Sequence, residues 1–224
     1  MPTRPASLTI TLPSGGHVSG LLQKPANAKA CYVFAHGAGA DMKHAFMEAI
    51  AQGLAERGIA SLRFNFPFME QGSKRADTPA VAHAAIRAAV AEAARHMPGV
   101  PLFAGGKSYG GRMSTQAQAA EPLPGVKGIV LLGFPLHPAG KPSTERAAHL
   151  PGVKLPMLFL QGTRDALADL DLITQTTASL GNQATLHIVH GADHAFHVLV
   201  RSGRTDAQVR EELLDSMAAW MARH

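Results

Sequence analysis

The hydrophobic and polar positions follow two different periods along the chain. Residues 7–12 and 18–22 alternate between apolar and polar side chains, and the Pro-Ser-Gly-Gly segment at residues 13–16 separates them. Alternation with a period of two is typical of strands with one buried face, and a short segment rich in Pro and Gly favours a turn. The first part of the chain is therefore predicted to form an antiparallel hairpin.

After the hairpin, short apolar segments alternate with longer segments of helical periodicity. The apolar segments predict strands at residues 30–35, 59–64, 101–105, 127–133, 155–161 and 184–189. The helical segments predict helices at residues 42–57, 79–97, 110–120, 166–180 and 206–222. Apolar strands joined by helices are typical of a parallel sheet covered on both faces. The sequence thus predicts an α/β fold, with a mostly parallel sheet that the N-terminal antiparallel hairpin extends.

The helix predicted at residues 79–97 is rich in alanine. Its apolar residues are predicted to form one narrow buried stripe of Val81, Ala85, Ala88 and Ala89. Small side chains on this stripe favour close packing of the helix on the sheet.

Length and composition predict a single domain, residues 1–224, with a substantial core. The chain has 224 residues, of which 46% are hydrophobic and 17% are charged, as in globular proteins. No internal repeat or linker interrupts the pattern. Between the strand that ends near Phe134 and the one that begins near Leu155, the chain is too short for a separate lid domain. A site at this edge of the sheet is therefore expected to be open or covered by loops.

The N-terminal segment and the single cysteine indicate in which cellular compartment the protein is expected. The first residues lack the continuous apolar stretch of a signal peptide, and nowhere do about 18 apolar residues run together. Cys31 lies within an apolar strand, which predicts a packed thiol, and one cysteine excludes a disulfide within the chain. We expect a cytoplasmic protein that does not enter a membrane.

The net charge of +5 and the isoelectric point near 9.7 raise the question of an anionic partner. Lys and Arg are scattered singly, apart from the pair Lys74-Arg75 and the neighbours Arg201 and Arg204. No aromatic residues lie between them to stack on bases. A solvated basic surface is predicted, and a nucleic-acid partner is not.

The motif G-x-S-x-G at residues 106–110 places Ser108 between an apolar strand and a helical segment. This context is that of a nucleophile elbow, a strained turn that exposes a serine hydroxyl at the edge of a sheet. The glycines two positions away are needed because a Cβ atom there would collide with a neighbouring element. Ser108 is therefore the predicted nucleophile.

A serine hydroxyl needs a base, a residue that orients the base, and donors for the oxyanion. His194, in a loop between the last strand and the last helix, is the predicted base, and Asp165, after the preceding strand, is the predicted acid. Asp169 and Asp171 are alternatives for the acid, although both fall in a predicted helix. Asp193, beside the base, is predicted to stabilise its own loop.

The backbone N–H of Tyr109, together with that of Ala38 or Gly39, is predicted to form the oxyanion hole. The ring of His36 is predicted to bond to nearby backbone and to hold the shape of this loop.

A metal site is the chemical alternative for the histidines of the C-terminal segment. His190, His194 and His197 are spaced as metal ligands often are, but Gly191 interrupts the helix that would align them, and no H-E-x-x-H motif occurs. No metal and no organic cofactor are predicted.

Four motifs together resemble those of the α/β-hydrolase superfamily, and the resemblance spans nearly the whole chain. The motifs lie at residues 36–39, 106–113, 162–165 and 191–196. With the run at residues 63–68, the chain most resembles a compact dienelactone-hydrolase-like branch, which also includes a subunit of a eukaryotic histone-acetyltransferase complex. Dienelactone hydrolases use a cysteine where this chain has Ser108, so their lactone substrate is not implied.

The resemblance and the predicted triad imply hydrolysis of small carboxylic esters or thioesters through an acyl-enzyme intermediate. Amide hydrolysis, carbon–carbon bond hydrolysis and acyl transfer use the same frame. The alternative from another class is a catalytically silent scaffold that binds a partner protein.

For the substrate, an apolar wall of Phe66, Phe68 and Met69 is predicted, with Lys107 beside it. Further positive charges near this edge raise the hypothesis that acidic esters are favoured; they are Arg112, Arg164, Lys74 and Arg75. Short acyl chains are expected, since a lidless pocket buries few methylenes.

Overall fold

One mixed sheet runs through residues 4–224, the residues that this computed structural model describes. Its strands follow the order β1-β2-β4-β3-β5-β6-β7-β8. In chain order they are β1 (Ala6–Thr11), β2 (His17–Gln23), β3 (Ala30–Ala35), β4 (Ile59–Phe64), β5 (Leu102–Lys107), β6 (Val126–Leu132), β7 (Met157–Gly162) and β8 (Ala184–Val189). The helices are α1 (Ala45–Glu56), α2 (Pro67–Glu70), α3 (Pro79–His96), α4 (Tyr109–Ala120), α5 (Leu170–Ser179) and α6 (Asp206–Met221).

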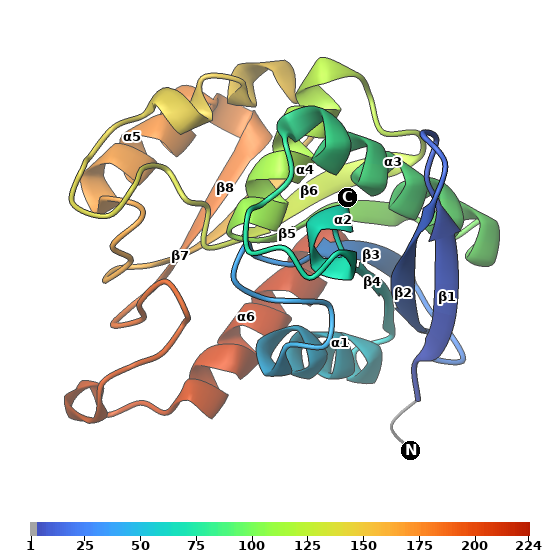
Figure 1. Ribbon diagram of the computed structural model, residues 1–224. Coiled ribbons are helices and arrows are strands. Elements are labelled where there is room, and N and C mark those ends of the chain that lie inside the picture. The colour runs from blue at the N-terminus through green and yellow to red at the C-terminus, as the bar shows by residue number, and fades with distance from the viewer. Residues whose placement is uncertain (1–3) are drawn as a thin grey trace.

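Strand directions match the predicted fold. β1 pairs with β2, and β2 with β4, in antiparallel fashion, whereas β3 to β8 pair in parallel. In Figure 1 the hairpin of β1 and β2 forms one edge of the sheet. The prediction of a mostly parallel sheet with an N-terminal antiparallel hairpin is confirmed.

The two faces of the sheet carry separate cores because successive strand residues point to opposite sides. On β3, Cys31 and Val33 belong to the core under α3, α4 and α5, and Tyr32 and Phe34 belong to the core under α1 and α6. Figure 1 shows α1 and α6 together on one side of the sheet. Every residue of β3 is buried, as the apolar segment predicted.

The buried stripe of α3 differs from the prediction. Val81 is 42% exposed, and Ala88 is only partly buried. The buried positions follow the spacing of three and four residues from a start one residue later. They are Ala82, Ala85, Ile86, Ala89, Val90 and Ala93. Residue 81 lies in the first turn after Pro79, and there the helix presents it to solvent.

The connection from β6 to β7 holds no lid domain. It contains two short 3₁₀ helices, η1 (Glu145–Ala147) and η2 (Leu150–Gly152).

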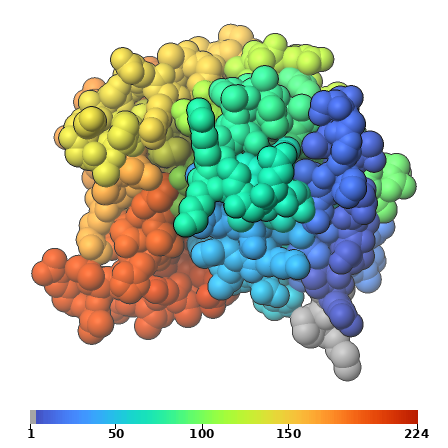
Figure 2. All heavy atoms as spheres, viewed as in Figure 1, coloured from blue at the N-terminus to red at the C-terminus, as the bar shows by residue number. Residues whose placement is uncertain are grey.

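The N-terminal hairpin lies far from the segment that joins β8 to α6 (Figure 2). Figure 2 shows the N-terminal hairpin in blue on one side and the segment between β8 and α6 in orange on the other. That segment includes the 3₁₀ helix η4 (Val200–Ser202), whose Val200 is 96% exposed. Across residues 4–224, each helix is either too short or too polar to cross a membrane.

Candidate active site

The predicted site residues lie in loops that follow strands of the parallel part of the sheet. Ser108 follows β5, Asp165 follows β7 and His194 follows β8. The loop that includes Gly37, Ala38 and Gly39 follows β3 and lines the same cavity as Ser108 and His194. Parallel strands end at the same edge, so loops far apart in sequence meet there.

Ser108 lies in a strained turn between β5 and α4. Its φ is 51° and its ψ is −116°, a region that residues other than glycine rarely adopt. Its N–H donates to the carbonyl of Leu132 at 3.0 Å. A Cβ atom on Gly106 would overlap the carbonyl oxygen of Ala35, and one on Gly110 would lie 2.5 Å from that oxygen. The two glycines thus allow β3 to approach the turn.

Replacing Gly106 with alanine is expected to destabilise the protein by about 2–4 kcal/mol, because β3 and β5 must separate where Ala35 pairs with Gly106. Thermal and urea unfolding measure the loss. Gly152→Ala is the matched control, since its Cβ would meet only Ala119, at an ordinary contact distance of 3.5 Å or more. Equal stability of the two variants would contradict this explanation of the motif.

Ser108, His194 and Asp165 form a continuous chain of hydrogen bonds. Ser108 Oγ lies 2.9 Å from His194 Nε2, and His194 Nδ1 lies 2.7 Å from Asp165 Oδ2. A carboxylate can only accept, so Nδ1 donates to Asp165 and Nε2 is left to accept the Ser108 proton. This tautomer is the one that a general base requires.

The carboxylate of Asp165 is fully buried and held by two further donors. Its side chain is 0% exposed. Gln161 Nε2 donates to Oδ2 at 2.6 Å, and the N–H of Leu167 donates to Oδ1 at 2.8 Å. The amide of Gln161 is itself oriented, because its Oε1 accepts from the N–H of Phe134 at 2.9 Å. Gln161 was not predicted, and its signal in the sequence is a polar residue near the end of an otherwise apolar strand.

The two alternative acids lie elsewhere. Asp169 is the N-cap of α5, where its carboxylate accepts from the N–H of Leu172 at 3.0 Å. Asp171 is exposed in the first turn of the same helix. Among the three aspartates, Asp165 is the one that contacts His194.

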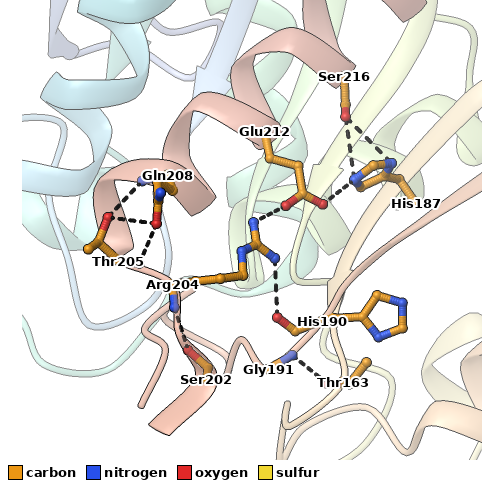
Figure 3. Close-up of polar contacts among 10 residues, drawn as sticks. All are labelled: Thr163, His187, His190, Gly191, Ser202, Arg204, Thr205, Gln208, Glu212 and Ser216. Carbon is orange, nitrogen blue, oxygen red and sulfur yellow. Dashed lines mark hydrogen bonds and ion pairs between the residues drawn. The ribbon is translucent and has the colours of Figure 1, made fainter. Parts of the chain in front are cut away.

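A network of polar contacts holds residues 190–191, at the start of the segment that carries His194, as Figure 3 shows. Arg204 pairs with Glu212 of α6 and also donates to the carbonyl of His190 at 3.4 Å. Glu212 in turn pairs with His187 of β8 at 2.8 Å. Thr163, after β7, accepts from the N–H of Gly191 at 2.9 Å. The segment is therefore tied to α6, to β8 and to the loop that bears Asp165.

Asp193 stabilises its own loop, as predicted. Its Oδ1 accepts from the N–H groups of Ala195 at 2.8 Å and of His197 at 3.0 Å. The ring of His197 pairs with Asp206 at 2.8 Å. No group of three or more potential metal ligands gathers anywhere in residues 4–224.

His36 shapes the loop that carries the predicted oxyanion donors. Its Nδ1 lies 2.8 Å from the carbonyl of Gly37, and the N–H of Phe66 donates to its Nε2 at 3.0 Å. Burial lowers the pKa of His36, so the ring stays neutral, with Nδ1 donating and Nε2 accepting. The prediction that this ring bonds to nearby backbone is confirmed.

The N–H groups of Tyr109, Ala38 and Gly39 are available for a ligand. None of them donates a hydrogen bond within residues 4–224. Tyr109 opens α4 directly after Ser108, and the other two line the cavity beside it. Free N–H groups at a helix start favour a negative charge.

A cavity of about 350 Å³ opens beside Ser108 and His194. Its apolar lining includes Phe46, Met47, Leu167 and Ala195, and residues 37–40 also line it. A mostly apolar cavity of this size fits a small organic group.

The predicted aromatic wall was wrong for this cavity. Phe66 and Phe68 are 0% and 1% exposed, and they pack in the core against His36 and Tyr109. Met69 is partly buried next to them and does not line the cavity. The side chains that line it instead come mainly from the start of α1.

The predicted positive charges do not gather at the cavity. Lys107 lines it, whereas Lys74, Arg75, Arg112 and Arg164 do not. Arg164 instead donates to the carbonyl of Gly191 at 3.2 Å. The hypothesis of a preference for acidic esters therefore loses most of its basis.

A family model described as an alpha/beta hydrolase domain matches residues 28–222. The chain belongs to this α/β-hydrolase family. Solved structures share the fold over almost the full length. A dienelactone hydrolase from Anabaena variabilis superposes with a TM-score of 0.79 at 19% identity, covering 100% of this chain and 99% of that one. A serine hydrolase homologue from Coxiella burnetii gives 0.76 at 20%, covering 94% and 96%.

The same comparison includes XC6422 from Xanthomonas campestris, described as an α/β serine hydrolase without a lid. It superposes with a TM-score of 0.75 at 23% identity, covering 98% of this chain and 96% of that one. The short β6–β7 connection of the present α/β-hydrolase agrees with that lidless form.

Proposed function

We propose that this α/β-hydrolase is a serine hydrolase that cleaves small carboxylic esters or thioesters through an acyl-enzyme intermediate. The observation that carries the proposal is the chain of hydrogen bonds from Ser108 Oγ through His194 to the buried Asp165. A serine held at a strained turn beside an oriented imidazole has the arrangement that nucleophilic catalysis requires.

In the first half of the reaction, Ser108 Oγ attacks the carbonyl carbon of the substrate and His194 Nε2 takes its proton. Asp165 keeps the proton of the neutral ring on Nδ1 and stabilises the imidazolium that forms. The oxygen of the tetrahedral intermediate accepts from the N–H of Tyr109 and from that of Ala38 or Gly39. His194 then donates its proton to the leaving alcohol or thiol.

In the second half, a water molecule occupies the place of the leaving group. His194 removes a proton from this water as it attacks the acyl-serine, and a second tetrahedral intermediate forms in the same oxyanion hole. Collapse of this intermediate releases the acid and returns the proton from His194 to Ser108. Apart from this water molecule, each step uses only side chains and backbone N–H groups of the protein.

The acyl-chain dependence tests the proposal and the size of the cavity together. We expect p-nitrophenyl acetate and butanoate to be hydrolysed with higher kcat/KM than octanoate and dodecanoate. The cavity beside Ser108 has no lid over it, so only the first methylenes of an acyl chain are buried, and each of them contributes about 0.8 kcal/mol. A maximum at dodecanoate would contradict this assignment of the cavity.

Labelling with a fluorophosphonate separates the hydrolase from a silent scaffold. A serine hydrolase reacts covalently at Ser108, and its ester hydrolysis stops after labelling. A folded protein that neither turns over any ester nor reacts with the fluorophosphonate would favour the scaffold.

A further inference from the structure

The ammonium group of Lys107 lies next to the hydrogen-bonded pair of Asp165 and His194. Lys107 is the last residue of β5 and directly precedes Ser108. A Cβ atom on Gly133, just after β6, would lie 3.0 Å from Lys107 Nζ, 3.4 Å from His194 Nδ1 and 3.5 Å from Asp165 Oδ2. The three polar groups therefore surround one small space, which a side chain at position 133 would fill.

Lys107 Nζ is buried and has no hydrogen-bond partner among residues 4–224. Its nearest aromatic contact is the ring of Phe196, whose centroid lies 5.5 Å away. Burying an ammonium group without a hydrogen bond is unfavourable, and an apolar side chain of the same length would fill this space without that cost. The methylene groups of Lys107 can line the cavity without the ammonium group, so packing does not explain why a charged residue lies here.

Several titratable groups face this ammonium group or its surroundings. Asp165 and Asp193 attract it, from the loops after β7 and β8. At the start of α1, His44 lines the same cavity as Lys107. On the α6 side, Asp206 and Arg210 line a separate hollow with Phe196. Asp165 is the acid that contacts His194 directly, which makes this pair the group on which the charge of Lys107 acts most closely.

We propose that Lys107 is a positioning residue, whose buried positive charge keeps Asp165 ionised and lowers the proton affinity of His194. The rate measurements below rest on the proposed hydrolase function, but the spectroscopic one does not. A positive charge beside the pair disfavours a second one on the imidazole. His194 therefore stays a neutral base to lower pH, and it returns the Ser108 proton more readily to a leaving group.

Lys107 is positively charged over the pH range in which an imidazole titrates. Burial lowers the pKa of Lys107 to about 8, and the attraction of Asp165 and Asp193 opposes this shift. Below that pH the ammonium group is present, and this range includes the ordinary titration range of an imidazole. Above it, the charge and its effect on His194 disappear together.

Lys107→Met tests the proposal through the pH dependence of kcat/KM for p-nitrophenyl acetate. We expect the acid limb of the profile to move to higher pH by about one unit, whatever the height of the plateau, because Lys107 also lines the cavity. Lys127→Met is the matched control, because it removes the same charge from an exposed site near the start of β6. Its acid limb should coincide with that of the wild type.

A ¹⁵N NMR titration of the His194 ring tests the same point without turnover, with its signals assigned from the His194→Gln variant. In the wild type, the ring signals should show a second inflection near pH 8, as Lys107 loses its proton. In Lys107→Met this inflection should disappear, and the main titration should move to higher pH.

Two results would overturn the proposal. The first is an acid limb that does not move in Lys107→Met, whether or not the plateau is lower. In that case Lys107 contributes packing alone, even if Ser108 is the nucleophile. The second is a wild-type ring titration with a single inflection up to the pH at which the protein unfolds, which decides the question even if the variant fails to fold. Failure of the hydrolase function would appear separately, as absent turnover and absent fluorophosphonate labelling.

Discussion

Ser108→Ala is expected to lower kcat for p-nitrophenyl acetate by a factor on the order of 10⁵–10⁶, with the fold unchanged. The substitution removes the oxygen that lies 2.9 Å from His194 Nε2, and no other hydroxyl among residues 4–224 joins this chain of hydrogen bonds. Covalent labelling by a fluorophosphonate should disappear in parallel. The measurements are the burst and steady-state phases of p-nitrophenol release and the mass of the labelled protein.

Ser114→Ala is a useful comparison for this variant. Ser114 lies on α4, and its buried hydroxyl donates to the carbonyl of Gly110 at 2.8 Å, away from the chain of hydrogen bonds. We expect it to keep turnover within about threefold of the wild type, since it loses one internal hydrogen bond worth about 1 kcal/mol of stability. If Ser108→Ala retained more than a tenth of the wild-type rate, another group would have to be the nucleophile.

The elements around Ser108 were predictable because their causes are local in sequence. The apolar run before the motif, the glycines around the serine and the helical segment after it predict a strand, a tight turn and a helix. The structure has them as β5, the turn at Ser108 and α4. The approach of Asp165 and His194 to Ser108 was predictable from their positions after successive predicted strands, since residues that follow parallel strands meet at one edge of the sheet.

The cavity wall was not predictable in the same way. Phe66 and Phe68 follow a strand as the site residues do, but apolar residues there can face either the core or a cavity. Here the N–H of Phe66 bonds to His36, and this contact turns the segment toward the core. Phe46 and Met47 line the cavity from the start of α1, and nothing in their own pattern distinguishes a cavity wall from a helix core face.

The contacts around Asp165 and Lys107 also could not be predicted from the sequence. A glutamine near the end of an apolar strand and a lysine beside a serine carry no pattern of their own. Their meaning comes from distances across the sheet, such as the 2.6 Å between Gln161 Nε2 and Asp165 Oδ2. Sequence order identifies loops that meet, but contacts between strands decide which side chains share a buried space.

Asp165→Asn is expected to lower kcat/KM by about 10⁴, the loss expected when the base is held in the wrong tautomer. Asp165 Oδ2 accepts from both His194 Nδ1 and Gln161 Nε2, and Oδ1 accepts from the N–H of Leu167. An asparagine amide must place its NH₂ group at one of these two positions. At Oδ2 it meets two donors and drives the His194 proton to Nε2, so that the ring cannot take the proton of Ser108. At Oδ1 it meets the N–H of Leu167, and a buried donor is left without an acceptor.

The control is Asp169→Asn, which makes the same substitution at an exposed aspartate four residues away. Asparagine is as good an N-cap as aspartate, so α5 should keep its start and the variant its activity. The measurements are kcat/KM, the rate of fluorophosphonate labelling and the melting temperature of both variants. A large loss of activity in Asp169→Asn, with Asp165→Asn nearly unaffected, would transfer the orienting role to the other acid. If only Asp165→Asn loses activity, the orienting role belongs to Asp165, whose carboxylate contacts His194.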